Sequence, residues 1–488
     1  MKQKIYGIFR KTPKVIKENL PFLIILTIIC WLTFATVLDN GFVSDDIAGF
    51  VRNDKNHYIG RLLNLKEFSV NRLTYAISYQ LFGLNPTPLH VLAVIIHNIN
   101  CLLAFFLTLK IFKNKRIAYI ASSLFCVHPV VTEPVSWISG RHYLFNTTVI
   151  LINMLLYLEF RRKKDKIFLY ASLLLFSLGL VTQRSAWALV LPFLIVTTEL
   201  FFLKPWERIK KLTKRVAPIY YFLLAILFVG VAYHKEILTR FHFMRTEVSG
   251  PTEAFLAEKP SYINRIAYTA GSATKLLFYP KDLSIYHEGE VVRPSFITFG
   301  IAVPIVSTIL IIYWIKKRHY KKAGLLIGIY LTLLPTFSPI QVSWYIADRY
   351  LYLPTLFFTI LLAITIENLA KNTRIKNAEL YITIIIMSLY FYKDILRNAD
   401  WQNRKTLWEA TARTNPNSPR VYNNLGDVYG LEGDLEKSIH NFQRALQLEP
   451  NYPEAMYNLG NTYKQAGEVE KGEKLMQEAL KLKPNMLE

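Results

Sequence analysis

Long apolar runs without a charged residue are the feature that most constrains this chain. Residues 21–37 and 217–233 contain no Asp, Glu, Lys or Arg. A helix of roughly 17 to 25 apolar residues is long enough to cross about 30 Å of hydrocarbon. The sequence therefore predicts an all-α membrane protein, a polytopic helix bundle, and a purely soluble fold is excluded.

Eleven runs fit the length and composition of a spanning helix. They are 20–38, 87–112, 117–134, 143–160, 167–183, 187–203, 217–233, 296–315, 323–340, 353–370 and 378–396. A further apolar stretch at 262–280 contains Arg265 and Lys275. Those two charges favour a helix that lies at the membrane interface over one that crosses the bilayer.

The basic residues, which give the chain a net charge of +23, predict how the helices are oriented. They form short clusters directly beside apolar runs, without interleaved aromatics, so nucleic-acid binding is disfavoured. The clusters are the tail 2–14 and residues 113–116, 161–166, 204–215, 316–322 and 371–376. With eleven crossings all six fall on one side, which the positive-inside rule makes cytoplasmic. The loops 39–86, 135–142, 184–186, 234–295 and 341–352, and everything after 397, are then outside.

The C-terminal residues have a different sequence pattern from the apolar runs. Pro416, Pro450 and Pro484 recur every 34 residues, and leucines, glycines, tyrosines and alanines between them keep the same period. This period is typical of tetratricopeptides, which are pairs of helices with small residues at their contacts. We expect a membrane domain over 1–399 and a repeat domain over 400–488, divided into a half-unit 400–417 and repeats 418–451 and 452–485. Trp401 and Trp408 are expected to lean on the membrane domain.

Two adjacent carboxylates stand just after the first apolar run. Asp45 and Asp46 end the segment Gly-Phe-Val-Ser-Asp-Asp at 41–46, and Arg52 follows. Charged groups beside hydrocarbon are candidates for function, and a carboxylate with a close neighbour and partial desolvation suits a general base. The alternative is a solvated loop with a helix cap.

Two further polar segments are expected on the same side of the membrane. His128 and Glu133 lie in His-Pro-Val-Val-Thr-Glu-Pro-Val, and Arg141 follows shortly after. Such residues suit a phosphate or a sugar hydroxyl, although two prolines and a belt tryptophan also explain the segment as an interfacial turn. Asp348 and Arg349 form the second segment; Arg349 either neutralises Asp348 or binds a lipid phosphate through its guanidinium.

The remaining motifs of common enzymes are not convincing in this sequence. It carries no phosphate-binding glycine loop, zinc spacing, Ser-His-Asp order or dinucleotide fingerprint. The three cysteines, Cys30, Cys101 and Cys126, lie in or beside apolar runs. They are interpreted as small core residues that form neither a disulfide framework nor a metal site.

The ordered set of motifs resembles one known family. The set comprises the Ser-Asp-Asp loop at 44–46, Gly-Leu-Asn-Pro at 83–86, His-Pro-Val-Val-Thr-Glu-Pro-Val at 128–135, Asp-Arg-Tyr-Leu-Tyr-Leu-Pro at 348–354 and the terminal repeats. Over nearly the whole chain, and in the same order, these resemble the transmembrane and tetratricopeptide-repeat O-mannosyltransferases. That family belongs to the GT-C superfamily of glycosyltransferases.

The resemblance implies an inverting enzyme that moves a sugar from a polyprenyl-phosphate donor to a hydroxyl on the outer face. Asp45 would be the catalytic base and Asp46 its neighbour. Some GT-C enzymes use a divalent metal, and here such an ion would bind between Asp45 and Asp46. Arg349 and Arg141 would contact the donor phosphate. The wider set expected to bind donor or substrate is His128, Glu133, Arg141, Arg349, Asp348 and Arg52. The partners implied are the lipid bilayer, the lipid-linked donor and a polypeptide acceptor recruited by the repeats.

Two departures from the family pattern keep alternatives open. Tyr143 stands where many members have an acidic residue, and Gln183-Arg184 stands where many have Lys-Glu. The sugar and the acceptor are therefore open, and an enzyme acting on envelope glycolipid or polysaccharide is one alternative. A non-catalytic membrane scaffold that works through its repeats is another. Residue usage rich in Lys, Ile and Asn, without a C-terminal retention signal, favours a bacterial cytoplasmic membrane over an endoplasmic reticulum.

Overall fold

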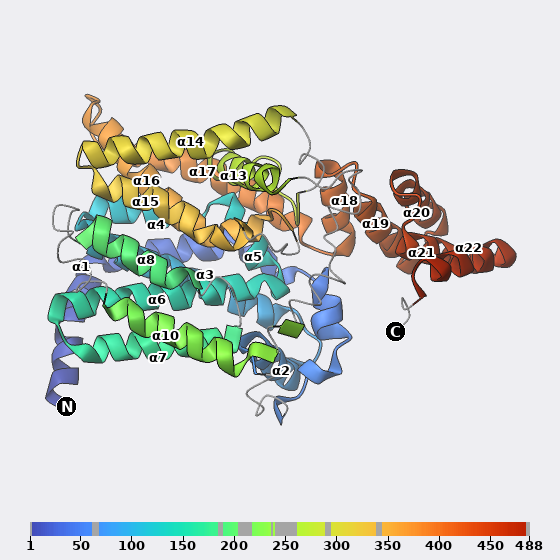
Figure 1. The fold of residues 1–488 in the computed structure, drawn as a ribbon, viewed down its shortest axis with the longest axis horizontal. Helices are drawn as coiled ribbons and strands as arrows, with labels where there is room; N and C mark the ends of the chain where they lie inside the picture. The colour runs from blue at the N-terminus through green and yellow to red at the C-terminus, as the bar shows by residue number, and fades with distance from the viewer. Residues whose placement is uncertain are drawn as a thin grey trace.

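The chain folds into a bundle of roughly parallel helices from which a smaller helical tail projects at one end (Figure 1). The computed structural model describes residues 2–60, 68–183, 189–203, 217–235, 238–239, 261–287, 294–337 and 344–484. All regular elements within these ranges are helical, which confirms the all-α prediction.

The main helices of the bundle coincide with the predicted apolar runs. They are α1 (Lys2–Thr33), α3 (Thr87–Phe112), α4 (Lys115–Cys126), α6 (Arg141–Lys163), α7 (Lys166–Gln183), α8 (Leu191–Thr197), α10 (Pro218–Ala232), α14 (Pro294–Lys316), α15 (Tyr320–Thr332), α16 (Tyr352–Lys371) and α17 (Ala378–Asp400). Within the described residues, five helices are long and apolar enough to span a membrane, and three shorter apolar helices accompany them. The number of crossings stays a prediction.

One predicted run breaks earlier than expected. The run 117–134 is helical as α4 only up to Cys126, and then continues as two short helices, Pro129–Val131 and α5 (Thr132–Ser136). Pro129 has no backbone N–H to continue the ladder of α4. The break places Glu133 in a separate turn of the chain.

The stretch 262–280 forms the helix α13 (Tyr262–Phe278). In Figure 1 it is seen nearly end-on, whereas its neighbours run across the view, so α13 crosses the direction of the bundle. Its Arg265 and Lys275 side chains lie on the half-buried part of the helix. That α13 lies at the membrane interface stays a prediction.

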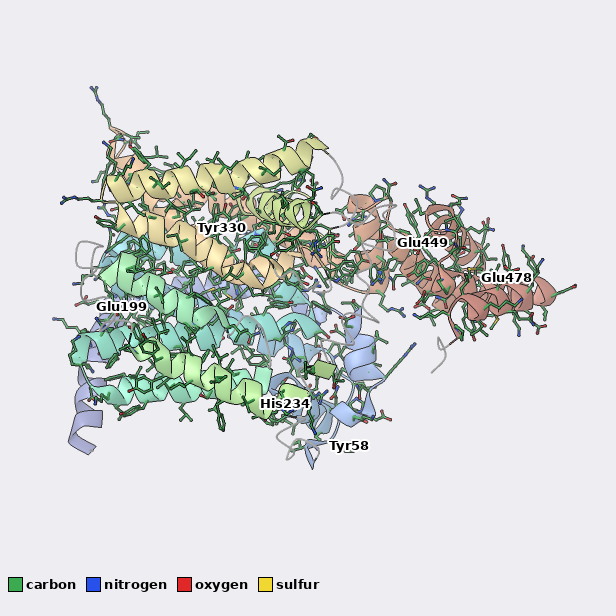
Figure 2. All side chains as sticks on the ribbon, viewed as in Figure 1. Tyr58, Glu199, His234, Tyr330, Glu449 and Glu478 are labelled. Atoms are coloured by element: carbon green, nitrogen blue, oxygen red, sulfur yellow. The ribbon has the colours of Figure 1, made fainter. Side chains whose placement is uncertain are left out.

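The two ends of the bundle differ in chemistry. At the end far from the tail, Lys115 pairs with Glu18 at 3.1 Å and Arg116 with Glu379 at 3.3 Å. Lys321 donates to the Ile111 carbonyl at the same end. The described basic clusters therefore gather at this far end, opposite the end that carries the tail, which is called the tail end below; the cluster 204–215 lies outside the described residues. In Figure 2 the label Glu199 marks the far end and the label Tyr58 marks the tail end.

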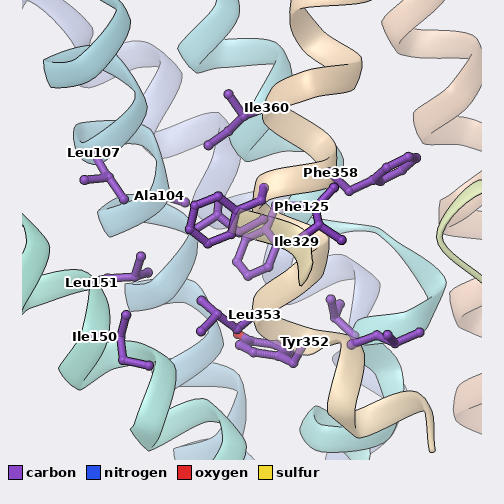
Figure 3. Packing of buried hydrophobic residues seen from close by; sticks show 14 of the residues in the cluster. Ala104, Leu107, Phe125, Ile150, Leu151, Ile329, Tyr352, Leu353, Phe358 and Ile360 are labelled. Atoms are coloured by element: carbon purple, nitrogen blue, oxygen red, sulfur yellow. The ribbon is translucent and has the colours of Figure 1, made fainter. Parts of the chain in front are cut away.

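The apolar core is centred on α16. Side chains of α3, α4, α6 and α15 converge on it, among them Ala104, Phe125, Ile150 and Ile329 (Figure 3). Tyr352, at the start of α16, is fully buried in this packing. The first turn of α16 is thus held from several sides, and the short helix Asp348–Leu351 directly before it carries residues discussed below.

The tail consists of α18 (Arg404–Thr414), α19 (Pro419–Leu431), α20 (Leu435–Leu448), α21 (Pro453–Gln465) and α22 (Val469–Leu482). Paired helices approach closely where Gly426 faces the Phe442 ring and Gly460 faces the backbone of Gly472. These are the small residues that the repeat pattern predicts at helix contacts.

The tail is fixed to the bundle. Trp401 and Trp408 are buried in one apolar cluster with Val43 and Trp137 of the bundle, which confirms their expected position. The Asn415 amide donates to Ser284 Oγ at 2.9 Å. The Gly41 amide donates to the Gln402 carbonyl at 2.9 Å, which joins the first loop to the chain that enters the tail.

Candidate active site

The two adjacent carboxylates at the tail end have opposite environments. Ser44 takes a positive φ of 50°, and the chain then turns into a short helical segment, so that Asp45 is exposed and Asp46 is fully buried. Asp46 Oδ1 accepts hydrogen bonds from the Ser139 amide at 2.7 Å and the Ser139 hydroxyl at 2.5 Å. Its Oδ2 accepts from the Val43 amide at 3.2 Å. Asp46 therefore ties the first loop to the segment before α6, and only Asp45 faces the surroundings.

Burial dominates the electrostatics of Asp46. Removal of the carboxyl from water raises its pKa to about 7, although the bonds from Ser139 and Val43 and the charge of Arg141 act in the opposite direction. Near neutral pH the Asp46 carboxyl is therefore protonated in part of the molecules.

Arg141 lies beneath this loop and is completely buried. Its Nε donates to the Ile138 carbonyl at 2.8 Å, and its guanidinium lies 5.0 Å from the ring centre of Tyr75. Within the described residues its two terminal nitrogens make no hydrogen bond of ordinary geometry. A buried cation with donors to spare favours an anion nearby.

Glu133 and Arg349, 216 residues apart, form a buried ion pair. Glu133 Oε1 accepts from Arg349 Nη1 at 2.6 Å, and Oε2 accepts from the Arg349 amide at 2.8 Å. The same Nη1 donates to the Ile285 carbonyl at 2.7 Å. The Arg349 guanidinium also lies over the rings of Trp137 and Tyr350, at 5.2 and 5.1 Å. Glu133 therefore fixes the position of Arg349.

Asp348 interacts with residues other than Arg349, so Arg349 does not serve to neutralise Asp348. His287 Nε2 lies 2.7 Å from Asp348 Oδ1, and the Ser284 amide donates to Oδ2 at 2.9 Å. Arg397 of α17 approaches the same carboxylate at 3.8 Å. Asp348 thus holds the segment 284–287 and α17 together at the tail end.

A small pocket opens between the first turns of α6 and α16. Tyr143, Asn146, Thr147, Ile150, Arg349, Tyr350, Tyr352 and Leu353 line it. Arg349 supplies its cationic wall, and three tyrosines supply rings. The hollow has room for about one water molecule in this structure, so a sugar joined to a phosphate could enter only after its walls move apart.

Two of the expected site residues are not brought into this arrangement. His128 is buried between the rings of Phe358 and Tyr390; its Nε2 lies 3.0 Å from the Leu277 carbonyl and its Nδ1 accepts from the Val130 amide. Arg52 is exposed on the first loop, and no side-chain contact joins it to the pocket among the described residues. Asp46 and Arg141 lie in one cluster, and Glu133, Arg349 and Asp348 in another at the same end.

The sequence did not point to Ser139, Tyr75, His287 or Tyr350. Ser139 and His287 act only through contacts with distant carboxylates, for which a single sequence carries no signal. Tyr350 is the exception. It belongs to the Asp-Arg-Tyr motif, and its place beside the arginine is a signal that was available.

The arrangement does not present the two adjacent carboxylates to a single divalent ion. Both oxygens of Asp46 already accept hydrogen bonds from the protein, and Asp45 faces the other way, into solvent. No step below depends on a metal at this place.

Comparison with known proteins agrees with both parts of the chain. Two family models, described as TPR repeat and tetratricopeptide repeat, match residues 431–467 and 453–486. A protein O-mannosyl-transferase of Caenorhabditis elegans is 26% identical over 459 residues, covering 88% of this chain and 63% of the relative. Protein O-mannosyl-transferase TMTC3 of Homo sapiens is 22% identical over 471 residues, covering 84% of this chain and 49% of its own length.

A second human relative, protein O-mannosyl-transferase TMTC1, is 22% identical over 429 residues and covers 77% of this chain and 47% of its own length. The resemblance expected from the ordered motifs is thereby confirmed. This chain spans between about half and two thirds of the length of these curated relatives.

Proposed function

We propose that this chain is a membrane glycosyltransferase that moves a mannose-like sugar from a polyprenyl-phosphate donor to a serine or threonine hydroxyl of an exported protein. The observation that carries the proposal is the similarity over 84–88% of the chain to proteins named protein O-mannosyl-transferases. The arrangement at the tail end supports it, because an exposed carboxylate, a cationic pocket and a repeat tail share one end.

In the proposed reaction Asp45 acts as the general base. Its carboxylate accepts the proton of the acceptor hydroxyl while the hydroxyl oxygen forms a bond to the anomeric carbon of the sugar. The bond from that carbon to the phosphate oxygen breaks on the opposite face, which inverts the configuration. A positioned base of this kind contributes typically about 10²–10⁴ in rate. The leaving group is the lipid phosphate, already a stable anion, so it needs cations rather than a proton donor.

Arg349 is the proposed ligand of that phosphate. It lines the pocket, and its Nη1 is held by Glu133 and the Ile285 carbonyl, so the guanidinium is oriented before the donor arrives. Arg141 lies deeper and contributes positive potential beneath the loop that carries Asp45. Glu133 and Asp348 position their partners and do not meet the donor in this proposal. His128 and Arg52 do not line the pocket and have no step assigned to them in this proposal.

The proposed orientation places the tail end outside and the far end in the cytoplasm. The described basic clusters at the far end support this, because Lys and Arg accumulate in cytoplasmic loops. Eleven crossings in a bacterial cytoplasmic membrane complete the proposal. Donor, acceptor and tail then meet in one compartment.

The experiment is an Asp45→Asn substitution in membranes supplied with radiolabelled lipid-linked mannose. Loss of transfer is expected at normal expression, because the amide cannot accept the proton. Asp39→Asn is the matched control, since Asp39 is also an exposed carboxylate just after α1. Normal transfer by the Asp45 variant would contradict the mechanism. Label that enters lipid or polysaccharide rather than protein would contradict the acceptor.

A further inference from the structure

All three cysteines of the 488-residue chain converge on one point in the bundle. Cys30 comes from α1, Cys101 from α3 and Cys126 from the last residue of α4. His97 of α3 stands among them, one helical turn before Cys101. All four side chains are completely buried. The sequence interpretation, small core residues that form neither a disulfide framework nor a metal site, does not account for this convergence from three helices.

The donor atoms have the spacing of a metal site. The sulfurs of Cys30 and Cys126 and a ring nitrogen of His97 lie within 4.8 Å of one another. Cys101 Sγ lies 3.6 Å from His97 Nε2. In a tetrahedral zinc site, with Zn–S bonds of about 2.3 Å, neighbouring sulfurs are about 3.8 Å apart. Cys30, His97 and Cys126 therefore need to close by no more than about 1 Å to surround an ion of that size.

The histidine is held by an outer set of hydrogen bonds. His97 Nδ1 lies 2.6 Å from the Tyr352 hydroxyl, and the Asn100 amide donates to the same hydroxyl at 3.2 Å. Thr148 in turn donates to Asn100 Oδ1 at 2.7 Å. With Nδ1 bonded to Tyr352, Nε2 is the nitrogen that faces the sulfurs; it lies 3.1 Å from the Cys126 carbonyl, a contact that an ion would replace. Bonds of this kind orient metal-binding histidines in general.

We propose that Cys30, His97 and Cys126 bind a structural Zn²⁺ ion within the helix bundle, with the Cys101 thiol beside the ion as the fourth group. Thiolate and imidazole ligands suit zinc, and a closed site without access for water is the structural type. The thiolates of Cys30 and Cys126 with a neutral His97 balance the two charges of the ion. Charge balance matters at this depth, where an uncompensated charge is costly.

The site ties distant parts of the fold together. The ion would link α1 to α3 and α4. The hydrogen bond between His97 and Tyr352 extends this link to α16. Tyr352 also lines the pocket at the tail end. The zinc therefore has no place in the sugar chemistry, but it sets the position of one wall of that pocket.

The test measures metal in the purified full chain, carrying a tag without histidine and expressed with added zinc. Elemental analysis is expected to find close to one zinc per chain, retained during treatment with a chelator because the site is closed. A Cys30→Ser/Cys126→Ser double variant is expected to lose it. His90→Asn is the matched control, because His90 is a buried histidine of the same helix outside the cluster. Tyr352→Phe is expected to weaken zinc binding about 10- to 100-fold.

If the double variant does not fold, wild-type chain expressed with cobalt decides the question. The proposal expects the intense visible bands of tetrahedral, thiolate-bound Co²⁺. Wild-type chain that contains no stoichiometric metal, or a double variant that keeps its zinc, overturns the proposal. The readouts are metal content and spectrum, so they stand whether or not sugar transfer is found.

Discussion

Replacing Asp46 by Asn is expected to change stability in a way that depends on pH. Asp46 is buried, and its oxygens accept bonds from the Ser139 amide and hydroxyl and from the Val43 amide. Burial raises its pKa from the ordinary 3.8 to about 7. The asparagine variant keeps the shape of the side chain but never carries the charge.

The magnitude follows from the difference between folded and unfolded chain. Because the folded pKa lies above the unfolded one, the stabilisation due to the bound proton is fully present below about 3.8. It is lost as pH rises through about 7. Each pH unit across that window is worth about 1.4 kcal/mol, so the wild type loses up to about 4 kcal/mol relative to the variant.

The assay is thermal unfolding in detergent, followed by tryptophan fluorescence from pH 5 to pH 8. At pH 5 we expect the wild type to be the more stable chain, because the amide offers one acceptor oxygen to three donors. The gap between the chains is expected to close, and then reverse, toward pH 8. The control is Asp54→Asn, since the Asp54 side chain is 89% exposed. A gap that stays constant across this range would refute the reasoning about Asp46.

Two further substitutions test the packing of the site and of the tail. Glu133→Gln leaves the Arg349 charge buried without its partner and is expected to lower unfolding stability by about 3–5 kcal/mol; Glu18→Gln, in a half-exposed pair, is expected to stay within about 1 kcal/mol in the same thermal assay. Gly426→Ala places a Cβ at 2.7 Å from the Phe442 ring and is expected to loosen the tail by about 1–3 kcal/mol. Limited proteolysis of the full chain detects that loosening, and Gly49→Ala, in open space, is expected to change nothing.

The positions of the helices were predictable because their apolar runs are long and uninterrupted. The early end of α4 shows the limit of that reasoning, since hydropathy alone ignores Pro129. The repeat tail was predictable for a different reason, namely that its small residues and prolines recur at a fixed period. The site was predictable only as a set of residue types.

Pairing within the site could not be predicted from the sequence. Asp45 and Asp46 are chemically identical neighbours, and only the turn at Ser44 decides which one is buried. Arg349 follows Asp348 directly, yet it pairs with Glu133, because a residue next in sequence points in another direction in the turn before α16. Such choices depend on which helices pack side by side, which a single sequence does not state.

The junction between bundle and tail has a consequence for how an acceptor would be presented. Asn415 is hydrogen-bonded to Ser284 and Gly41 to Gln402, so the repeats are attached to the bundle rigidly and not through a flexible linker. A domain on a flexible linker samples a volume set by the length of the linker. A rigidly fixed domain instead holds a bound segment at one distance and one orientation relative to the bundle. An acceptor hydroxyl would meet Asp45 at high local concentration if its distance from the segment bound by the repeats equals the distance from the repeats to Asp45. Hydroxyls nearer to that segment or farther from it would hardly reach Asp45. The tail would then select position along an acceptor as much as the identity of the acceptor.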